Sequence, residues 1–79
     1  MPTGDAETTR LAQREIGRRS IDTSGLDVHA THGVVYLRGY IKCLRGHPTD
    51  LRHELEVINR VLRTKPGIRE VIIEVDIRE

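Results

Sequence analysis

The feature of the sequence that most constrains its fold is the alternation of apolar and polar residues from Leu26 to Ile41. The alternation breaks once, at His32-Gly33, and then resumes with the same period of two. A two-residue β-hairpin turn at this break makes inward positions on one strand face inward positions on the other. A helix requires a period of 3.6, so we predict a hairpin. Its predicted pairs are Thr31 with Val34, Ala30 with Val35, His29 with Tyr36, Val28 with Leu37, Asp27 with Arg38, and Leu26 with Gly39.

A helix is predicted on each side of the hairpin in the sequence. The first extends from Asp5, a favourable N-cap residue, to about Ser20, and its core-facing residues are Thr8, Leu11, Ala12 and Ile16. A turn at 22–25 then leads into the hairpin, and a loop at 42–48 follows it. The second helix begins after Thr49 or Asp50 and ends near Thr64, before Pro66-Gly67. Its apolar positions are Leu51, Leu55, Ile58 and Leu62, with Val61 beside them.

The last predicted strand covers residues 68–77. Its inward positions are Val71, Ile73, Val75 and Ile77. Because a helix connects the second strand to this one, the two should be parallel, with a right-handed crossover. The order α-β-β-α-β therefore predicts a two-layer α/β (α+β) sandwich, in which two helices cover one face of a three-stranded mixed sheet. The second strand is expected at its centre.

Length and composition limit the range of possible functions. The 79 residues are predicted to form a single domain with residues 1–4 disordered, and its core must be built from Ile, Leu and Val, since Trp and Phe are absent. So small a core is only marginally stable alone, which favours self-association. A net charge of +1 argues against a nucleic-acid partner. No signal peptide or membrane-spanning run is visible, and Cys43 is the single cysteine, so a cytoplasmic location is expected.

Two segments of the chain resemble the BON domain family of bacteria. They are Gly33-Val34-Val35-Tyr36-Leu37-Arg38-Gly39-Tyr40-Ile41 and, after the second helix, Pro66-Gly67-Ile68-Arg69-Glu70-Val71. The family shows a G-x-V-x-L-x-G-x-V strand and a G-V-x-x-V step into its last strand. The segment from Gly39 to Gly67 is a few residues longer than is usual in the family. The resemblance implies a non-catalytic interaction module, of a kind often proposed to bind phospholipid surfaces in exported proteins with several domains.

Gly39 has two structural interpretations. As an inward-facing residue without a side chain, it would let a helix approach the sheet closely. Alternatively, it marks a β-bulge or a kink in the strand.

One face of the predicted sheet is not covered by either helix. We expect Val34, Tyr36, Tyr40 and Ile72 to share this face, with His29 opposite Tyr36. These residues are candidates for an interface with a second copy or with another protein. Singly exposed apolar residues are also ordinary on protein surfaces, so the same residues are compatible with a solvated face.

A second candidate surface is the basic stripe of the first helix. Arg10, Arg14 and Arg18 recur every four residues, opposite the predicted core, and could meet anionic phospholipid head groups. The alternative is a solvated face, because Glu7 and Glu15 lie close enough in sequence to pair with these arginines.

The sequence gives less support to a metal site, a catalytic site or a phosphate-binding site. Cys43, His47 and His53 carry donor atoms that zinc or copper prefers, but their spacing matches no standard site, and a flexible loop followed by an exposed histidine explains them equally well. The run His53-Glu54-Leu55-Glu56-Val57 has no second histidine for the metalloprotease signature. No phosphate-binding loop or nucleophile elbow occurs. We therefore predict no catalytic residues, no cofactor and no small-molecule substrate.

Overall fold

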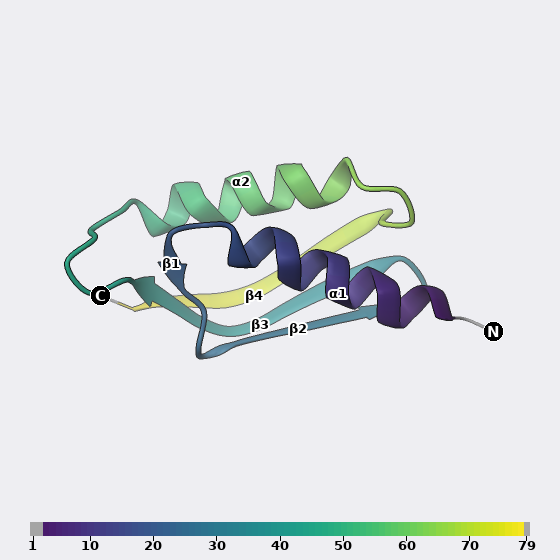
Figure 1. The fold of residues 1–79 in the computed structure, drawn as a ribbon, viewed down its shortest axis with the longest axis horizontal. Coiled ribbons are helices and arrows are strands. Elements are labelled where there is room, and N and C mark those ends of the chain that lie inside the picture. Colours follow the sequence, from purple (N-terminus) through teal and green to yellow (C-terminus); the bar gives the residue numbers. More distant parts are fainter. Residues whose placement is uncertain (1–2, 79) are drawn as a thin grey trace.

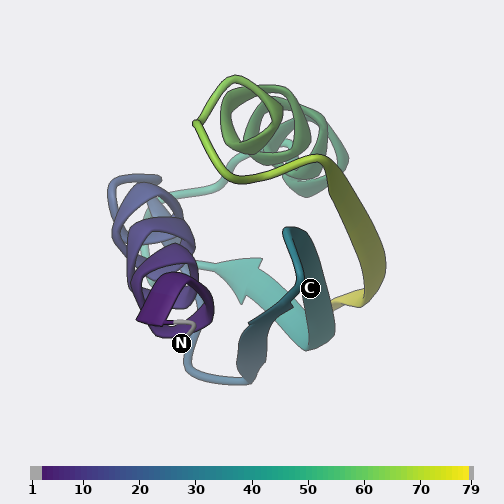
Figure 2. The same ribbon diagram turned by 90° about the vertical axis from the view of Figure 1, so that its right-hand side faces the viewer.

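In the computed structural model, which describes residues 3–78, a mixed sheet lies on one side and two helices on the other (Figures 1 and 2). Strand β3 is central: β4 pairs with one of its edges, and β2 and β1 pair in turn with the other. The predicted two-layer α+β architecture is confirmed. The elements are α1 (Thr3–Gly17), β1 (Ile21–Asp22), β2 (Leu26–Thr31), β3 (Val34–Cys43), α2 (Leu51–Arg63) and β4 (Glu70–Arg78).

The β2–β3 hairpin has the register that the alternation predicts. All six expected residue pairs are present, from Leu26 with Gly39 to Thr31 with Val34. His32 and Gly33 have φ angles of 51° and 81°, both in the left-handed region. Two such residues form the tight turn whose twist matches that of paired strands. The turn therefore sets which side chains of β2 and β3 face the helices.

Strand β4 is parallel to β3, as the intervening helix predicts. Nine residue pairs join them, from Val34 with Glu70 to Lys42 with Arg78. The amide of Arg69 donates a hydrogen bond of 2.8 Å to the carbonyl oxygen of Gly33. This bond ties the hairpin turn to the start of β4.

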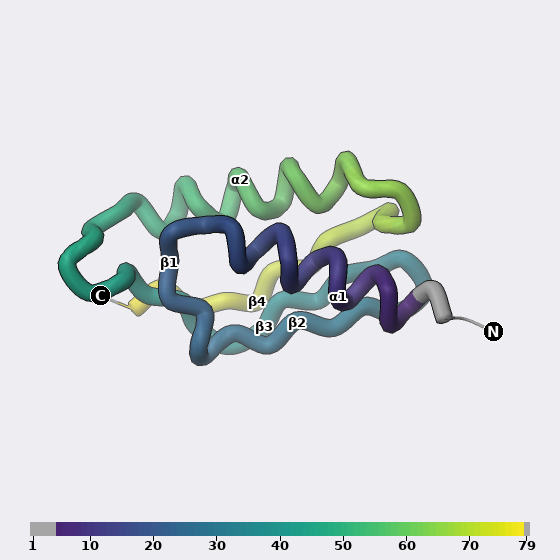
Figure 3. The backbone as a smooth tube through the Cα atoms, viewed as in Figure 1, coloured from purple at the N-terminus to yellow at the C-terminus, as the bar shows by residue number. Residues whose placement is uncertain are grey.

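The described sheet has four strands instead of the predicted three, because Ile21 and Asp22 form β1 at the far end of β3. Only residues 23–25 remain as the predicted turn. Between the pairs Asp22–Lys42 and Leu26–Gly39, three residues on one side face two on the other, which is a β-bulge. Figure 3 shows the short loop that the backbone forms here between β1 and β2.

Gly39 lies at this bulge. Its φ is 108°, and a Cβ atom there would overlap the carbonyl oxygen of Gly25. The predicted close approach of a helix is therefore wrong: a neighbouring strand end, not a helix, occupies the space.

Helix α1 differs from its prediction at both ends. It begins at Thr3 and ends at Gly17, three residues before Ser20. Of the four residues predicted to be disordered, Thr3 and Gly4 belong to α1, and residues 1–2 lie outside the described part. Asp5 is not the N-cap, since it lies within the helix, where its Oδ1 accepts a hydrogen bond of 3.0 Å from the amide of His32.

Helix α2 follows its prediction closely. Asp50 is the N-cap, and its Oδ1 accepts a hydrogen bond of 3.2 Å from the amide of His53. The helix buries Leu51, Ile58 and Leu62, while Leu55 and Val61 stay partly exposed. The largest fully buried side chains of the core come from α1, α2 and β3, and they are Ile16, Val35, Leu37, Ile41 and Leu62.

A partly buried ion pair connects the segment that follows α1 to α2. Glu54 is only 8% exposed, and its Oε1 accepts a hydrogen bond of 2.7 Å from Nε of Arg19. A second bond of 3.1 Å joins Arg19 Nη2 to Glu54 Oε2. The hydrogen bonds from Arg19 hold the pKa of Glu54 below its usual range, although burial acts in the opposite direction.

We expect Gly39→Ala to lower the free energy of unfolding by roughly 3 kcal/mol or more, because it adds left-handed strain and a clash with Gly25. Gly46→Ala is the matched control, since Gly46 also has positive φ (74°) but nothing within 4 Å of an added Cβ. That variant should lose about 1 kcal/mol. Urea unfolding measures both, and equal losses would contradict the role given to Gly39.

The Arg19–Glu54 pair should make the free energy of unfolding depend on pH in the acidic range. The pKa of Glu54 is lower in the folded state than in the unfolded state. The contribution of its ionised carboxylate to stability is therefore complete above the unfolded-state pKa and is lost as the pH falls through the folded-state pKa. In urea unfolding at several pH values, Glu54→Gln should therefore be less stable than the wild type at neutral pH, and this difference should shrink on acidification. Glu56→Gln removes an exposed carboxylate of the same helix and should keep the wild-type acid dependence. A Glu54→Gln deficit that stays constant with pH would contradict the assignment.

Candidate interaction surface on the sheet

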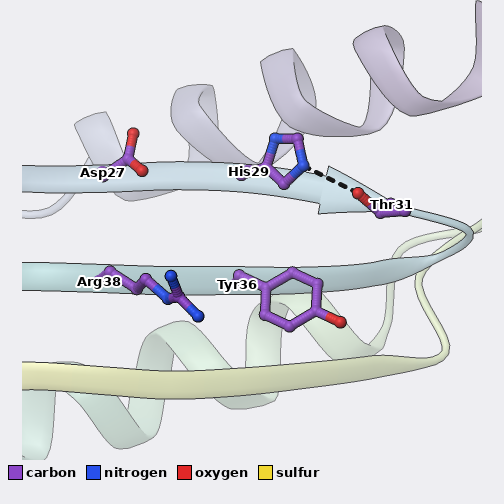
Figure 4. Close-up of a pocket in the computed structure, with 5 residues that line it drawn as sticks. All are labelled: Asp27, His29, Thr31, Tyr36 and Arg38. Carbon is purple, nitrogen blue, oxygen red and sulfur yellow. Dashed lines mark hydrogen bonds between the residues drawn. The ribbon is translucent and has the colours of Figure 1, made fainter.

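The candidate site is the sheet face that points away from both helices, here called the outer face. Alternation along the strands places its residues there, since their neighbours Val35, Leu37 and Val71 point into the core. Figure 4 shows five of its side chains standing in front of the sheet, with the helices behind. The outer face consists of Asp27, His29 and Thr31 from β2, Val34, Tyr36, Arg38 and Tyr40 from β3, and Glu70, Ile72, Glu74, Asp76 and Arg78 from β4.

Its centre is a row of three side chains across the three main strands. Tyr36 pairs with His29 on one side and with Ile72 on the other. The rings of His29 and Tyr36 are 6.4 Å apart between centroids and tilted by 32°. The Oγ1 of Thr31 lies 2.8 Å from Nε2 of His29 in a hydrogen bond, which orients the imidazole (Figure 4). Tyr36 and Ile72 stay partly exposed, so the row offers apolar surface to solvent.

Charged side chains lie next to this row. Arg38 Nε donates a hydrogen bond of 3.0 Å to Glu74 Oε1, and Asp27 faces Arg38 across the hairpin. Both partners of the pair are more than half exposed, so the pair adds little to stability. Asp27, His29, Thr31, Tyr36 and Arg38 together line a shallow hollow of about 400 Å³.

Tyr40 stands apart from the central row, at the far end of β3. The guanidinium of Arg78 lies 4.3 Å from the centroid of its ring, in a cation–π contact. Gly25 lies directly beneath the same ring, where a Cβ would clash with it. The structure thus places His29, Val34, Tyr36, Tyr40 and Ile72 on one face, as predicted. It brings His29, Tyr36 and Ile72 into one row, whereas Val34 and Tyr40 lie two and four residues from Tyr36 along β3.

Sequence reasoning missed the Arg38–Glu74 pair and the contact of Arg78 with Tyr40. Both depend on the parallel register of β3 and β4, and the residues of each pair are far apart in the sequence. The alternation predicts which face of β4 each residue occupies. It does not predict which residue of β3 lies beside it.

The predicted arginine stripe is only partly present. Arg10 and Arg14 are exposed on α1, near Glu7 and Leu11. Arg18 lies beyond the end of the helix, and its Nη1 is 3.3 Å from Oε2 of Glu15. The prediction of a three-residue stripe on one helix was wrong, because the helix ends at Gly17.

The residues considered for a metal site do not form one. Cys43 Sγ lies 3.4 Å from both the amide nitrogen and the carbonyl oxygen of Thr49, so it closes the loop between β3 and α2. His47 lies in a turn of this loop, and His53 is exposed in the first turn of α2. Within residues 3–78, no three His, Cys, Asp or Glu side chains lie where they could hold a metal ion together.

Comparison with known proteins does not assign the chain to a family. A scan against protein-family models gives no match, and a search of curated proteins gives none either. The resemblance to the BON domain family therefore stays a prediction. Among the residues described, no helix has both the length and the apolar character needed to cross a membrane.

Proposed function

We propose that this chain is a non-catalytic interaction module, similar to a BON domain, that associates with a second copy of itself through the outer face. The observation that carries the proposal is the row of His29, Tyr36 and Ile72. This row presents partly exposed aromatic and aliphatic surface on the sheet face that no helix covers. Tyrosine at the centre of a surface, with charged groups around it, is typical of protein interfaces.

The size of the face suits a partner of the same kind. The backbone measures 43 Å along its longest axis and 20 Å across, and the sheet follows the long axis (Figure 1). A surface of these dimensions is of the order of the 800 Å² that each partner buries in a standard interface. The outer face also carries both signs of charge, with Glu70 near one end and Arg78 at the other. Two copies packed in opposite directions would bring unlike charges together.

The small core supports self-association in particular. Its fully buried side chains are aliphatic, with no aromatic residue among them. A domain of this size gains little stability from its own core. Covering the central row with a second copy would add apolar burial that one copy lacks.

Tyr36→Glu should weaken self-association at least about tenfold, because it places a charge at the centre of the contact. Sedimentation velocity over a concentration series measures the change. Gln13→Glu is the matched control, since it adds the same charge at an exposed position of α1, and it should associate like the wild type. A wild-type chain that remains monomeric at millimolar concentration would contradict the proposal, as would equal effects of the two variants.

A second candidate function is peripheral binding to anionic phospholipid surfaces through α1. One observation favours it: among the described residues, no carboxylate lies within ion-pair distance of Arg10 or Arg14, although Arg18 and Arg19 are both paired. Two unpaired guanidinium groups one helical turn apart can reach phosphate groups of a membrane surface.

Arg10→Glu with Arg14→Glu should reduce co-flotation with vesicles of phosphatidylserine and phosphatidylcholine by at least about tenfold. Binding by the wild type should also fall as salt is added. Arg52→Glu with Arg60→Glu makes the same charge change on exposed positions of α2 and should leave binding unchanged. Absence of wild-type binding at low ionic strength would exclude this candidate.

A further inference from the structure

The edge strands β2 and β4 differ in whether another element bonds to their outward backbone groups. On β2, the amide of Ala30 donates a hydrogen bond of 3.0 Å to Oγ1 of Thr9 in α1. Just beyond β2, the amide of His32 is bonded to Asp5 of the same helix. Helix α1 therefore occupies one backbone donor of β2 and one just beyond it, and covering an edge strand in this way is one means by which proteins protect it.

The far edge of β4 has no such cover. Within residues 3–78, β4 pairs only with β3, and no side chain bonds to its backbone. Figure 2 shows β4 at the margin of the sheet. Its helix-facing residues also differ from those of β3: Val35, Leu37 and Ile41 are fully buried, whereas Ile73, Val75 and Ile77 each keep part of their surface exposed. A nine-residue strand thus presents unpaired backbone groups next to partly exposed apolar side chains.

We propose that β4 pairs antiparallel with β4 of a second copy, in the register centred on Glu74. The inference rests on the proposed function for the identity of the partner, a second copy, and names a second contact between copies. In this register all nine residues of each strand find a partner. Across the junction, Glu70 faces Arg78, Val71 faces Ile77, Ile72 faces Asp76, Ile73 faces Val75, and Glu74 faces its own copy.

Side-chain chemistry favours this register over its neighbours. It places Glu70 opposite Arg78 at both ends, and it matches the helix-facing aliphatic residues with one another. The two Glu74 side chains meet at the symmetry axis, but each is already paired with Arg38 of its own chain. A shift by two residues in one direction sets Glu74 opposite Asp76, and a shift in the other sets Glu70 opposite Asp76. Each shift creates two contacts between acidic side chains, and each contact includes Asp76, which has no ion-pair partner among the described residues.

This pairing has a consequence for the outer face. The twofold axis runs perpendicular to the sheet, so both outer faces point the same way and form one continuous surface. Packing of two such surfaces through the central row would use a second, perpendicular axis, and the two axes generate a closed tetramer where they intersect. Loss of the outer-face contact alone would leave a dimer joined by β4.

The test uses single cysteines in a Cys43→Ser background. In the proposed register the Cα atoms of the two residues at position 74 lie about 5 Å apart, within the range for a disulfide. We expect Glu74→Cys to form disulfide-linked dimers under mild oxidation, as measured by non-reducing electrophoresis and intact mass. Asp76→Cys is the matched control on the same face of the same strand. Its two copies would lie roughly 13 Å apart, so it should stay unlinked.

Adding Tyr36→Glu to the Glu74→Cys chain separates this inference from the proposed function. Linkage that survives Tyr36→Glu supports the β4 contact, whatever becomes of the outer face. Linkage that disappears with Tyr36→Glu, or that is equal for Glu74→Cys and Asp76→Cys, overturns the inference and leaves outer-face association standing. No linkage together with a monomeric wild type overturns both.

Charge exchange in the Tyr36→Glu background, where the outer-face contact is weakened, provides a second check. Glu70→Arg and Arg78→Glu each replace the two end pairs by like charges, so each variant alone should associate about tenfold more weakly by sedimentation. An equimolar mixture restores both pairs between unlike chains and should recover wild-type association. Failure of the mixture to associate better than either variant alone would contradict the register.

Discussion

The register of β3 against its neighbours is the constraint on which the rest of the structure depends. The turn at His32 and Gly33 fixes which residues of β2 lie beside β3, and the bond from Arg69 to Gly33 fixes where β4 begins. Since side chains alternate between the two faces of a strand, one residue of slippage would move the core residues to the solvent side. The same register brings His29, Tyr36 and Ile72 into one row. The core and the proposed interface therefore have a common origin.

Local patterns predicted much of this arrangement. The hairpin follows from an alternation of period two that breaks at a favourable turn, and the parallel β4 follows from the helix that precedes it. The N-cap was narrowed to Thr49 or Asp50, because the apolar spacing of α2 starts directly after them, and the structure shows that it is Asp50. In each of these cases the determining residues lie close together in the sequence.

The remaining features depend on contacts between distant segments. Arg19 and Glu54 are 35 residues apart, and neither position suggests a buried pair by its spacing. Glu54 lies on the helix face that apolar spacing assigns to the core, so its burial needs a partner that only the folded chain supplies. The extent of α1 was misjudged for a similar reason: Asp5 serves the hairpin turn instead of the helix end. Of the predicted interface residues, Tyr40 lies four residues from Tyr36 along β3, next to the bulge, and so stands apart from the row.

The fold divides its surfaces into covered and uncovered parts, and the proposed associations follow from that division. Helices cover one face of the sheet, and α1 bonds to the amides of Ala30 in β2 and His32 just beyond it, while the outer face and the edge of β4 stay open. Concentration-dependent amide chemical shifts, measured by nuclear magnetic resonance on the intact chain, test this division most directly. We expect shifts that grow with concentration for Tyr36, Ile72 and the amides of β4, and constant shifts for the exposed positions of α1 and α2. Shifts that do not change with concentration, or that change mainly on the helices, would contradict the account.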